Sequence, residues 1–119
     1  MMYGQYQEKI STIDFVQILN DHTKEATYYY ENNWKVLREM AVEKGYIDTF
    51  QILETTFTED TPFHLLLITT YKNQTQYEIR EESFRELIEE KGELLLINQK
   101  KPAHFRKTIL SSEIVKHWD

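Results

Sequence analysis

The stretch Phe63–Tyr71 (FHLLLITTY) decides the fold that this sequence predicts. Its branched, aromatic and threonine residues are typical of a β-strand. A strand with one solvated face alternates apolar and polar side chains, but residues 65–68 are apolar at four consecutive positions, which indicates burial on both faces. Helices of the same chain can cover only one face. The pattern therefore predicts that a second copy of the chain covers the other face.

The neighbouring segments predict three further strands. Residues 47–57 (IDTFQILETTF) are also rich in strand-forming residues, and the polar loop 58–62 joins them to the first stretch, which predicts an antiparallel hairpin. Residues 9–19 (KISTIDFVQIL) predict a strand that closes at Asn20. Phe105–Trp118 (FRKTILSSEIVKHW) predicts a last strand, because threonine, isoleucine and valine dominate its middle.

Two helices are predicted between these strands. From about His22 to Lys44, large or apolar residues recur every three or four positions, which places Ala26, Tyr30, Trp34, Leu37 and Ala41 on one face. Gly45 then fits the end of the helix. Thr75–Glu78 (TQYE) fits the capping box of a second helix, which we expect to stop at Gly92. The short apolar run 94–97 fits either a helix or a strand.

The predicted order is β-α-β-β-α-β. This order is that of an α+β, ferredoxin-like fold, with two helices on one face of a four-stranded antiparallel sheet. A chain of 119 residues has room for one hydrophobic core, so we expect a single domain over residues 1–119, with residues 1–8 flexible.

Composition excludes several classes of function. The absence of cysteine excludes disulfides and thiolate chemistry, and three glycines leave no phosphate-binding glycine loop. The net charge of −6 argues against a nucleic-acid partner, which would require a basic surface. No apolar run approaches the roughly 18 residues of a membrane span. Residues 1–9 carry no export signal, so we expect a cytoplasmic protein unless a natural leader has been removed.

Four stretches of the sequence resemble the dimeric α+β barrel superfamily, and most closely a group of short uncharacterised bacterial proteins. They are Tyr30–Arg38 (YENNWKVLR), Lys44–Ile47 (KGYI), Leu66–Tyr71 (LLITTY) and Lys101–Arg106 (KPAHFR). In this superfamily two ferredoxin-like subunits pack their sheets face to face, so the resemblance implies a homodimer. The superfamily includes cofactor-independent quinone oxygenases, haem-binding and haem-degrading enzymes, lactone isomerases and chlorite-decomposing enzymes, so it implies an architecture and not a reaction.

The first predicted helix carries the candidate ligand-binding residues. Tyr30, Trp34 and Arg38 are four residues apart and share one stripe, with Asn33 beside them. This stripe fits core packing, with the Arg38 guanidinium stacked on the Trp34 ring. It also fits the wall of a cleft in which Asn33 and Arg38 donate hydrogen bonds to a planar, oxygen-bearing ligand. Asparagine and tryptophan line the substrate cleft of the quinone oxygenases that this superfamily includes.

Candidate catalytic residues are few. If the protein is an enzyme, His64 or Tyr30 is the candidate acid–base group. No metal-binding motif is present, and Glu113 and His117 are too far apart along a strand to share an ion, so the sequence predicts no metal site and no cofactor. His64 is the first residue to consider if a metal or haem were bound.

Two functions remain open. In the first, a homodimer binds a small planar or aromatic molecule between the first helix and the sheet, either as a binding protein or as a cofactor-independent, oxygenase-like enzyme. In the second, the protein is a non-catalytic dimeric sensor or accessory module with a filled core. A polar-lined cavity beside Trp34 would favour the first function.

Overall fold

The computed structural model describes residues 6–118. The elements follow in the order β1 (Tyr6–Ile18), α1 (Thr23–Tyr29), η1 (Tyr30–Trp34), α2 (Lys35–Glu43), β2 (Thr49–Glu54), β3 (Leu65–Tyr71), α3 (Gln74–Glu78), α4 (Arg80–Lys91), α5 (Pro102–Phe105) and β4 (Arg106–Trp118). The strand β1 begins three residues before its expected start. Residues 1–5 of the segment expected to be flexible lie outside the described residues.

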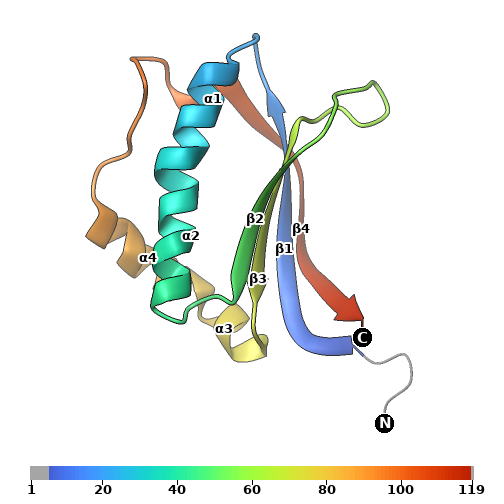
Figure 1. The fold of residues 1–119 in the computed structure, drawn as a ribbon, viewed down its shortest axis with the longest axis vertical. Helices are drawn as coiled ribbons and strands as arrows, with labels where there is room; N and C mark the ends of the chain where they lie inside the picture. Colours follow the sequence, from blue (N-terminus) through green and yellow to red (C-terminus); the bar gives the residue numbers. More distant parts are fainter. Residues whose placement is uncertain (1–5, 119) are drawn as a thin grey trace.

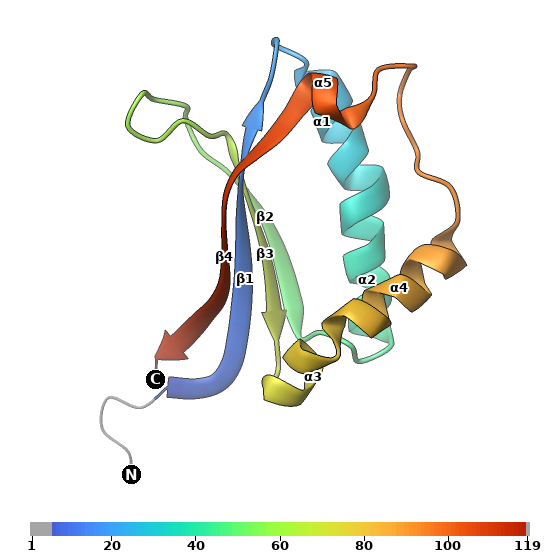
Figure 2. The same cartoon turned by 180° about the vertical axis from the view of Figure 1, so that it is seen from behind.

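The four strands form one antiparallel sheet in the order β2-β3-β1-β4. The helices lie on one face of this sheet, with α1 and α2 upright against it and α4 beside them (Figure 1). The view from behind shows α5 leading into β4 close to α1 (Figure 2). The predicted α+β, ferredoxin-like arrangement of strands and helices is therefore confirmed.

The first helix runs from Thr23 to Glu43 as three consecutive stretches, with a π turn, η1, between α1 and α2. A π turn has a wider backbone than an α-helix and is frequently found at functional sites. Periodicity predicted the helix but gave no sign of the π turn. The helix ends before Gly45, whose φ of 74° is a conformation that glycine adopts readily.

The N-cap of the second helix, Asn73, lies two residues before the predicted cap. The Oδ1 atom of Asn73 accepts a hydrogen bond from the Gln76 backbone N–H at 2.9 Å, and the Gln76 Oε1 atom accepts from the Lys72 N–H at 2.6 Å. Thr75 lies inside α3, so the predicted capping box at Thr75 was wrong. Asparagine is among the best N-cap residues, which explains why position 73 takes this role. The run 94–97 forms neither helix nor strand.

The core lies between the helices and one face of the sheet. Ile10, Tyr71 and Leu87 belong to one buried cluster, and Val16 and Leu67 belong to a second. Within β3, Leu67 and Tyr71 point toward the helices, because the side chains of a strand alternate between its faces.

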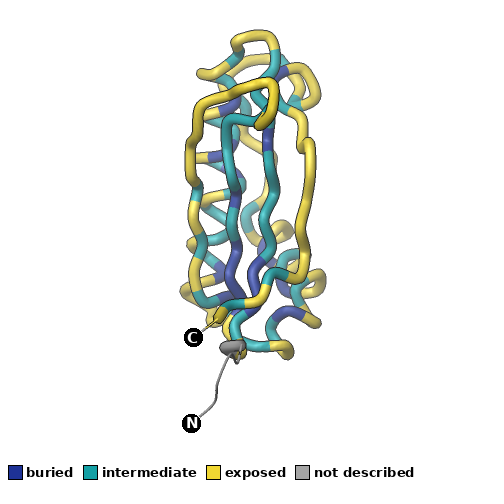
Figure 3. Tube along the Cα trace, turned by 90° about the vertical axis from the view of Figure 1, so that its right-hand side faces the viewer, coloured by how far each residue is buried: buried dark blue, intermediate teal, exposed yellow. Residues whose placement is uncertain are grey.

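The opposite face of the sheet is not covered by any helix of the described chain, and we call it the open face (Figure 3). Leu66 and Ile68 of β3 are half-buried on it. Leu53 of β2 pairs with Leu66 of β3, and Leu110 of β4 pairs with Phe15 of β1, which itself pairs with Leu66. Leu53 and Leu110 therefore belong to the same face as Leu66. Leu53 is 44% exposed and Leu110 is 59% exposed. The apolar strand that predicts double burial thus has one covered and one uncovered face within a single chain.

No helix within residues 6–118 is both long and apolar enough to cross a membrane.

Candidate functional site

A cavity of about 430 Å³ lies between the first helix, the sheet and the end of α4. All four predicted ligand-binding residues line it: Tyr30, Asn33, Trp34 and Arg38. Three of them lie in η1 and the fourth in α2. The other lining residues come from the sheet, from α1 and α2, and from the region where α4 ends: Asp14, Tyr29, Leu37, Leu67, Ile88, Lys91, Gly92, Leu94, Arg106 and Thr108.

Arg38 is held between two aromatic rings. The guanidinium carbon lies 4.3 Å from the ring centroid of Trp34 and 4.3 Å from that of Phe84, and Nε donates to the Thr69 hydroxyl at 3.1 Å. The stacking expected from the sequence is therefore present. Burial lowers the pKa of Arg38 to about 10, so the side chain remains a cation at neutral pH. Arg38 forms a rigid, charged part of the cavity wall.

Tyr30 is nearly buried, with 5% of its surface exposed. Burial raises the pKa of its hydroxyl, while the charge of Arg106 partly opposes this effect. The hydroxyl therefore stays protonated at neutral pH and is available as a hydrogen-bond donor rather than as a base. Within residues 6–118 it makes no hydrogen bond to another side chain or to the backbone.

Asn33 is engaged in a different role from the predicted one. Its Nδ2 atom donates to the carbonyl groups of Tyr29 and Leu95, each at 2.8 Å. Its Oδ1 atom accepts from the Leu95 N–H at 2.8 Å and from Lys91 Nζ at 3.0 Å. These four bonds saturate the amide, which is 4% exposed. Asn33 therefore fixes the chain after α4 against η1, and no N–H of its amide remains for a ligand.

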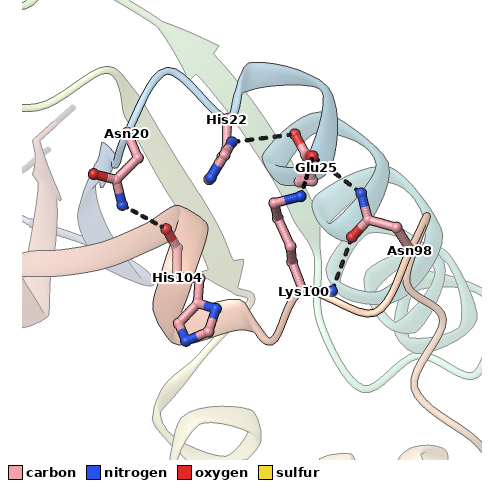
Figure 4. Close-up of polar contacts among 6 residues, drawn as sticks. All are labelled: Asn20, His22, Glu25, Asn98, Lys100 and His104. Atoms are coloured by element: carbon pink, nitrogen blue, oxygen red, sulfur yellow. Dashed lines mark hydrogen bonds and ion pairs between the residues drawn. The ribbon is translucent and has the colours of Figure 1, made fainter.

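The same connecting segment has a second attachment near α5 (Figure 4). The Glu25 carboxylate accepts a hydrogen bond from Asn98 Nδ2 at 3.0 Å and lies 3.8 Å from Lys100 Nζ. The hydrogen bond from Asn98 is the largest of the effects that lower the pKa of Glu25. His22 lies 3.8 Å from the same carboxylate. The segment between α4 and α5 is thus anchored to the first helix at both ends.

Three charged residues of the cavity were not predicted from the sequence: Asp14, Lys91 and Arg106. Asp14 belongs to the face of β1 that carries Ile10 and Val16, and this face points toward the core. A carboxylate on the core face of a strand was the feature of the sequence that could have identified Asp14 as a site residue. Its Oδ1 atom accepts from the Ser111 hydroxyl at 2.7 Å. No local pattern marked Lys91 or Arg106, since they reach the cavity only through the packing of α4 and β4.

His64 lies away from this cavity, and the structure does not bring it together with Tyr30. Its Nδ1 atom accepts a hydrogen bond from the Ile18 N–H at 2.9 Å, and its ring stacks on Phe57 at 5.2 Å between centroids. Of the two alternative acid–base candidates, Tyr30 lines the cavity and His64 does not. In the described part of the chain, no group of three or more His, Asp or Glu side chains is placed to hold a metal ion.

Comparison with known proteins shows similarity at the level of the fold. No protein-family model matches the sequence, and no curated protein matches it. An uncharacterised NIPSNAP-like domain protein from Burkholderia xenovorans has a similar structure, with a TM-score of 0.50 at 8% identity over 92% of this chain and 86% of that one.

Two further solved structures are similar. One is a dimeric protein of unknown function and ferredoxin-like fold from Bacteroides fragilis, with a TM-score of 0.48 and 11% identity over 92% of this chain and 100% of that one. The other is a candidate antibiotic biosynthesis monooxygenase from Nitrosomonas europaea, with a TM-score of 0.47 and 17% identity over 94% of each chain.

At these identities the similarity concerns the fold alone. The protein has an α+β, ferredoxin-like fold, and its structural neighbours include uncharacterised bacterial proteins. The resemblance stated from the sequence is confirmed to this extent. A shared fold does not carry a shared reaction, so the function has to be argued from the cavity.

Proposed function

We propose that this protein is a homodimer whose subunits each bind a small planar or aromatic molecule in the cavity beside Trp34. The observation that carries the proposal is the cavity itself. Its volume of about 430 Å³ falls within the range of roughly 300 to 1,000 Å³ that is typical of small-molecule sites. A filled interior at this position would instead have favoured the non-catalytic module.

The lining of the cavity suits a flat molecule. Trp34, Leu37 and Leu67 supply apolar surface, and the Tyr30 hydroxyl supplies a free donor. Trp34 is itself fixed by the edge of Phe50, at 5.9 Å between ring centroids, and by the stacked Arg38. A ring system bound here would meet side chains that are already ordered, which reduces the entropy lost on binding.

Acid–base chemistry is the kind of catalysis that these residues support. The Asp14 carboxylate is half-buried in the cavity wall and can accept a proton from an acidic group of the ligand, while Tyr30 can donate a hydrogen bond to a ligand oxygen. Proton removal from an electron-rich aromatic is the step with which a cofactor-independent, oxygenase-like reaction would begin. Asp14 therefore replaces His64 as our proposed base.

Binding is tested by NMR, because the chain has only two tryptophans. Their indole N–H signals are assigned with Trp118→Phe, and the protein is titrated with menadione, anthrone and naphthoate at up to millimolar concentration. We expect at least one probe to shift the Trp34 signal and to leave that of Trp118, which is 67% exposed, in place. Thr108→Phe, which fills part of the cavity from β4, should weaken the binding.

Three results would contradict ligand binding. They are the absence of any shift with all three probes, equal shifts of both indoles, and unchanged affinity in a folded Thr108→Phe protein. For the catalytic part, oxygen consumption with anthrone is compared between the wild type and Asp14→Asn. Catalysis that survives unchanged in Asp14→Asn would exclude this residue as the base.

The open face of the sheet supports the homodimer. Leu53, Leu66, Ile68 and Leu110 form an apolar surface on a sheet whose other face is already covered by helices. An uncovered surface of this kind promotes association, and a second copy of the same face is self-complementary under twofold symmetry. Two sheets that pack face to face would bury residues 65–68 on both sides, as their sequence predicts.

Light scattering at micromolar concentration tests the dimer, with twice the chain mass as the expected result. Leu110→Glu places a charge on the open face, in the edge strand β4, and should yield folded monomers. The matched control is Ile79→Glu, because Ile79 is 45% exposed but lies at the α3–α4 junction, on the helical side of the sheet. A monomeric wild type, or a Leu110→Glu protein that remains dimeric, would refute the proposed interface.

A further inference from the structure

We infer that the cavity takes a planar organic monoanion, whose carboxylate is bound by Arg106 with Lys91 as a second cation. The inference rests on the proposed function, because it specifies the class of molecule that the same cavity binds. Arg106 and Lys91, which both lie outside the first helix, recognise the charge of the ligand, and Arg38 forms part of the cavity wall.

The charge of the cavity differs in sign from that of the protein. The lining holds three cationic side chains, Arg38, Lys91 and Arg106, and one carboxylate, Asp14. The whole chain has a net charge of −6. A positively charged cavity in an acidic protein concentrates anions at the site, because low-dielectric walls focus the local field.

Within the described residues 6–118, none of these three cations has a carboxylate within 4.0 Å, and Asp14 acts on Arg38 only from a longer distance. The ion pairs found there, within 4.0 Å, involve other basic residues, such as Lys44 with Glu90 at 2.6 Å and Lys9 with Asp48 at 3.0 Å. The three cavity cations are all partly or largely removed from solvent. A charge that is taken out of water without a partner is costly, and a bound anion would offset that cost.

The unused donors identify which cations contact the ligand. Arg106 directs Nη2 to the Tyr29 hydroxyl at a long 3.5 Å, which leaves most of the five N–H groups of its guanidinium available. Lys91 uses two of its three N–H groups, on Asn33 and on the Glu93 carbonyl. The Arg38 guanidinium is enclosed between two rings. Arg106 is thus best placed for a paired contact with a carboxylate.

The neighbours of Arg106 complete the anion site. Tyr30 lines the same cavity as Arg106, whose charge partly opposes the rise that burial causes in the pKa of the Tyr30 hydroxyl. The protonated Tyr30 hydroxyl can then donate the additional hydrogen bond. Asp14 lines the same cavity and would repel a second anionic group, which is why we specify a monoanion.

The test compares naphthoate with its neutral amide, naphthamide, which has nearly the same shape. For the wild type we expect naphthoate to bind about tenfold more tightly, as a charge-assisted contact predicts. Arg106→Gln should weaken naphthoate binding about tenfold and change naphthamide binding less than about twofold. Lys91→Gln should act in the same direction with a smaller effect. Arg85→Gln, which removes an exposed cation of α4 that does not line the cavity, is the matched control.

The outcomes separate the inference from the proposed function. If neither probe binds, the inference is overturned, and the proposed function fails with it only when menadione and anthrone also leave the Trp34 signal unchanged. If both probes bind the wild type equally, or if Arg106→Gln and Lys91→Gln leave their ratio unchanged, the cavity binds planar molecules without selecting charge, and only the inference is overturned. Urea unfolding of each variant establishes that it is folded, and Arg106→Lys, which retains the charge, should recover part of the preference for naphthoate.

Discussion

Replacing Asn33 by alanine should release the chain segment that follows α4. The substitution removes four hydrogen bonds, two of which join η1 to the backbone of Leu95, sixty-two residues away. Leu95 is 45% exposed, so water can replace Asn33 at its N–H and carbonyl groups, and each bond contributes a net value of about 0.5 to 1 kcal/mol. We expect a loss of about 2 to 4 kcal/mol in the free energy of unfolding.

Urea unfolding at a fixed protein concentration measures this loss. With an m value of about 2 kcal/mol/M, the midpoint should fall by about 1 to 2 M while m stays the same. Amide hydrogen exchange gives a local readout, since the Leu95 N–H should lose its protection in the variant. Both measurements report on the attachment of the segment and do not depend on any ligand.

The matched control is the adjacent residue. Asn32 makes one side-chain hydrogen bond within the described chain, to the Tyr28 carbonyl at 2.9 Å in the same helix. Asn32→Ala should therefore cost less than about 1 kcal/mol and leave Leu95 protected. The reasoning is refuted if the two variants lose the same free energy, or if the Leu95 amide exchanges in Asn33→Ala as slowly as in the wild type.

Three other predictions follow from the fold. Leu87→Ala should cost about 2 to 5 kcal/mol in urea unfolding, because Leu87 is fully buried, while Ile88→Ala, at a position 53% exposed, should cost much less. Gly45→Ala should cost about 1 kcal/mol because φ is 74°, and Gly45→Asn should restore part of that loss by thermal denaturation. Glu86 accepts a hydrogen bond from Tyr46 and lies 3.4 Å from Lys44, and these contacts hold its pKa below the usual 4.5. A carboxyl group whose pKa is lowered by folding stabilises the folded state above the unfolded pKa and loses that contribution as the pH falls through the folded value. Glu86→Gln should therefore flatten the decline in stability below about pH 4.5 on acid titration, and an unchanged decline would contradict this assignment.

Local patterns determined the order of the elements and one wall of the site. The spacing of Tyr30, Trp34 and Arg38 fixed a common helix face, because side-chain direction in a helix follows from position alone. The consecutive apolar residues 65–68 predicted a strand with two apolar faces over Phe63–Tyr71, and β3 forms over Leu65–Tyr71 of this stretch. Local reasoning failed where two nearby signals compete, as at the second helix, where Asn73 and not Thr75 provides the cap.

The tertiary structure decided which groups share the cavity. Asp14, Lys91 and Arg106 come from β1, α4 and β4, and they line one space because β4 pairs with β1 and the helices cover the same face of the sheet. It also placed His64 apart from Tyr30, and it committed Asn33 to a distant backbone segment. A sequence specifies the face on which a side chain lies through local geometry. The partner of that side chain depends on strand register and on packing between remote segments, and these are set only when the whole chain folds.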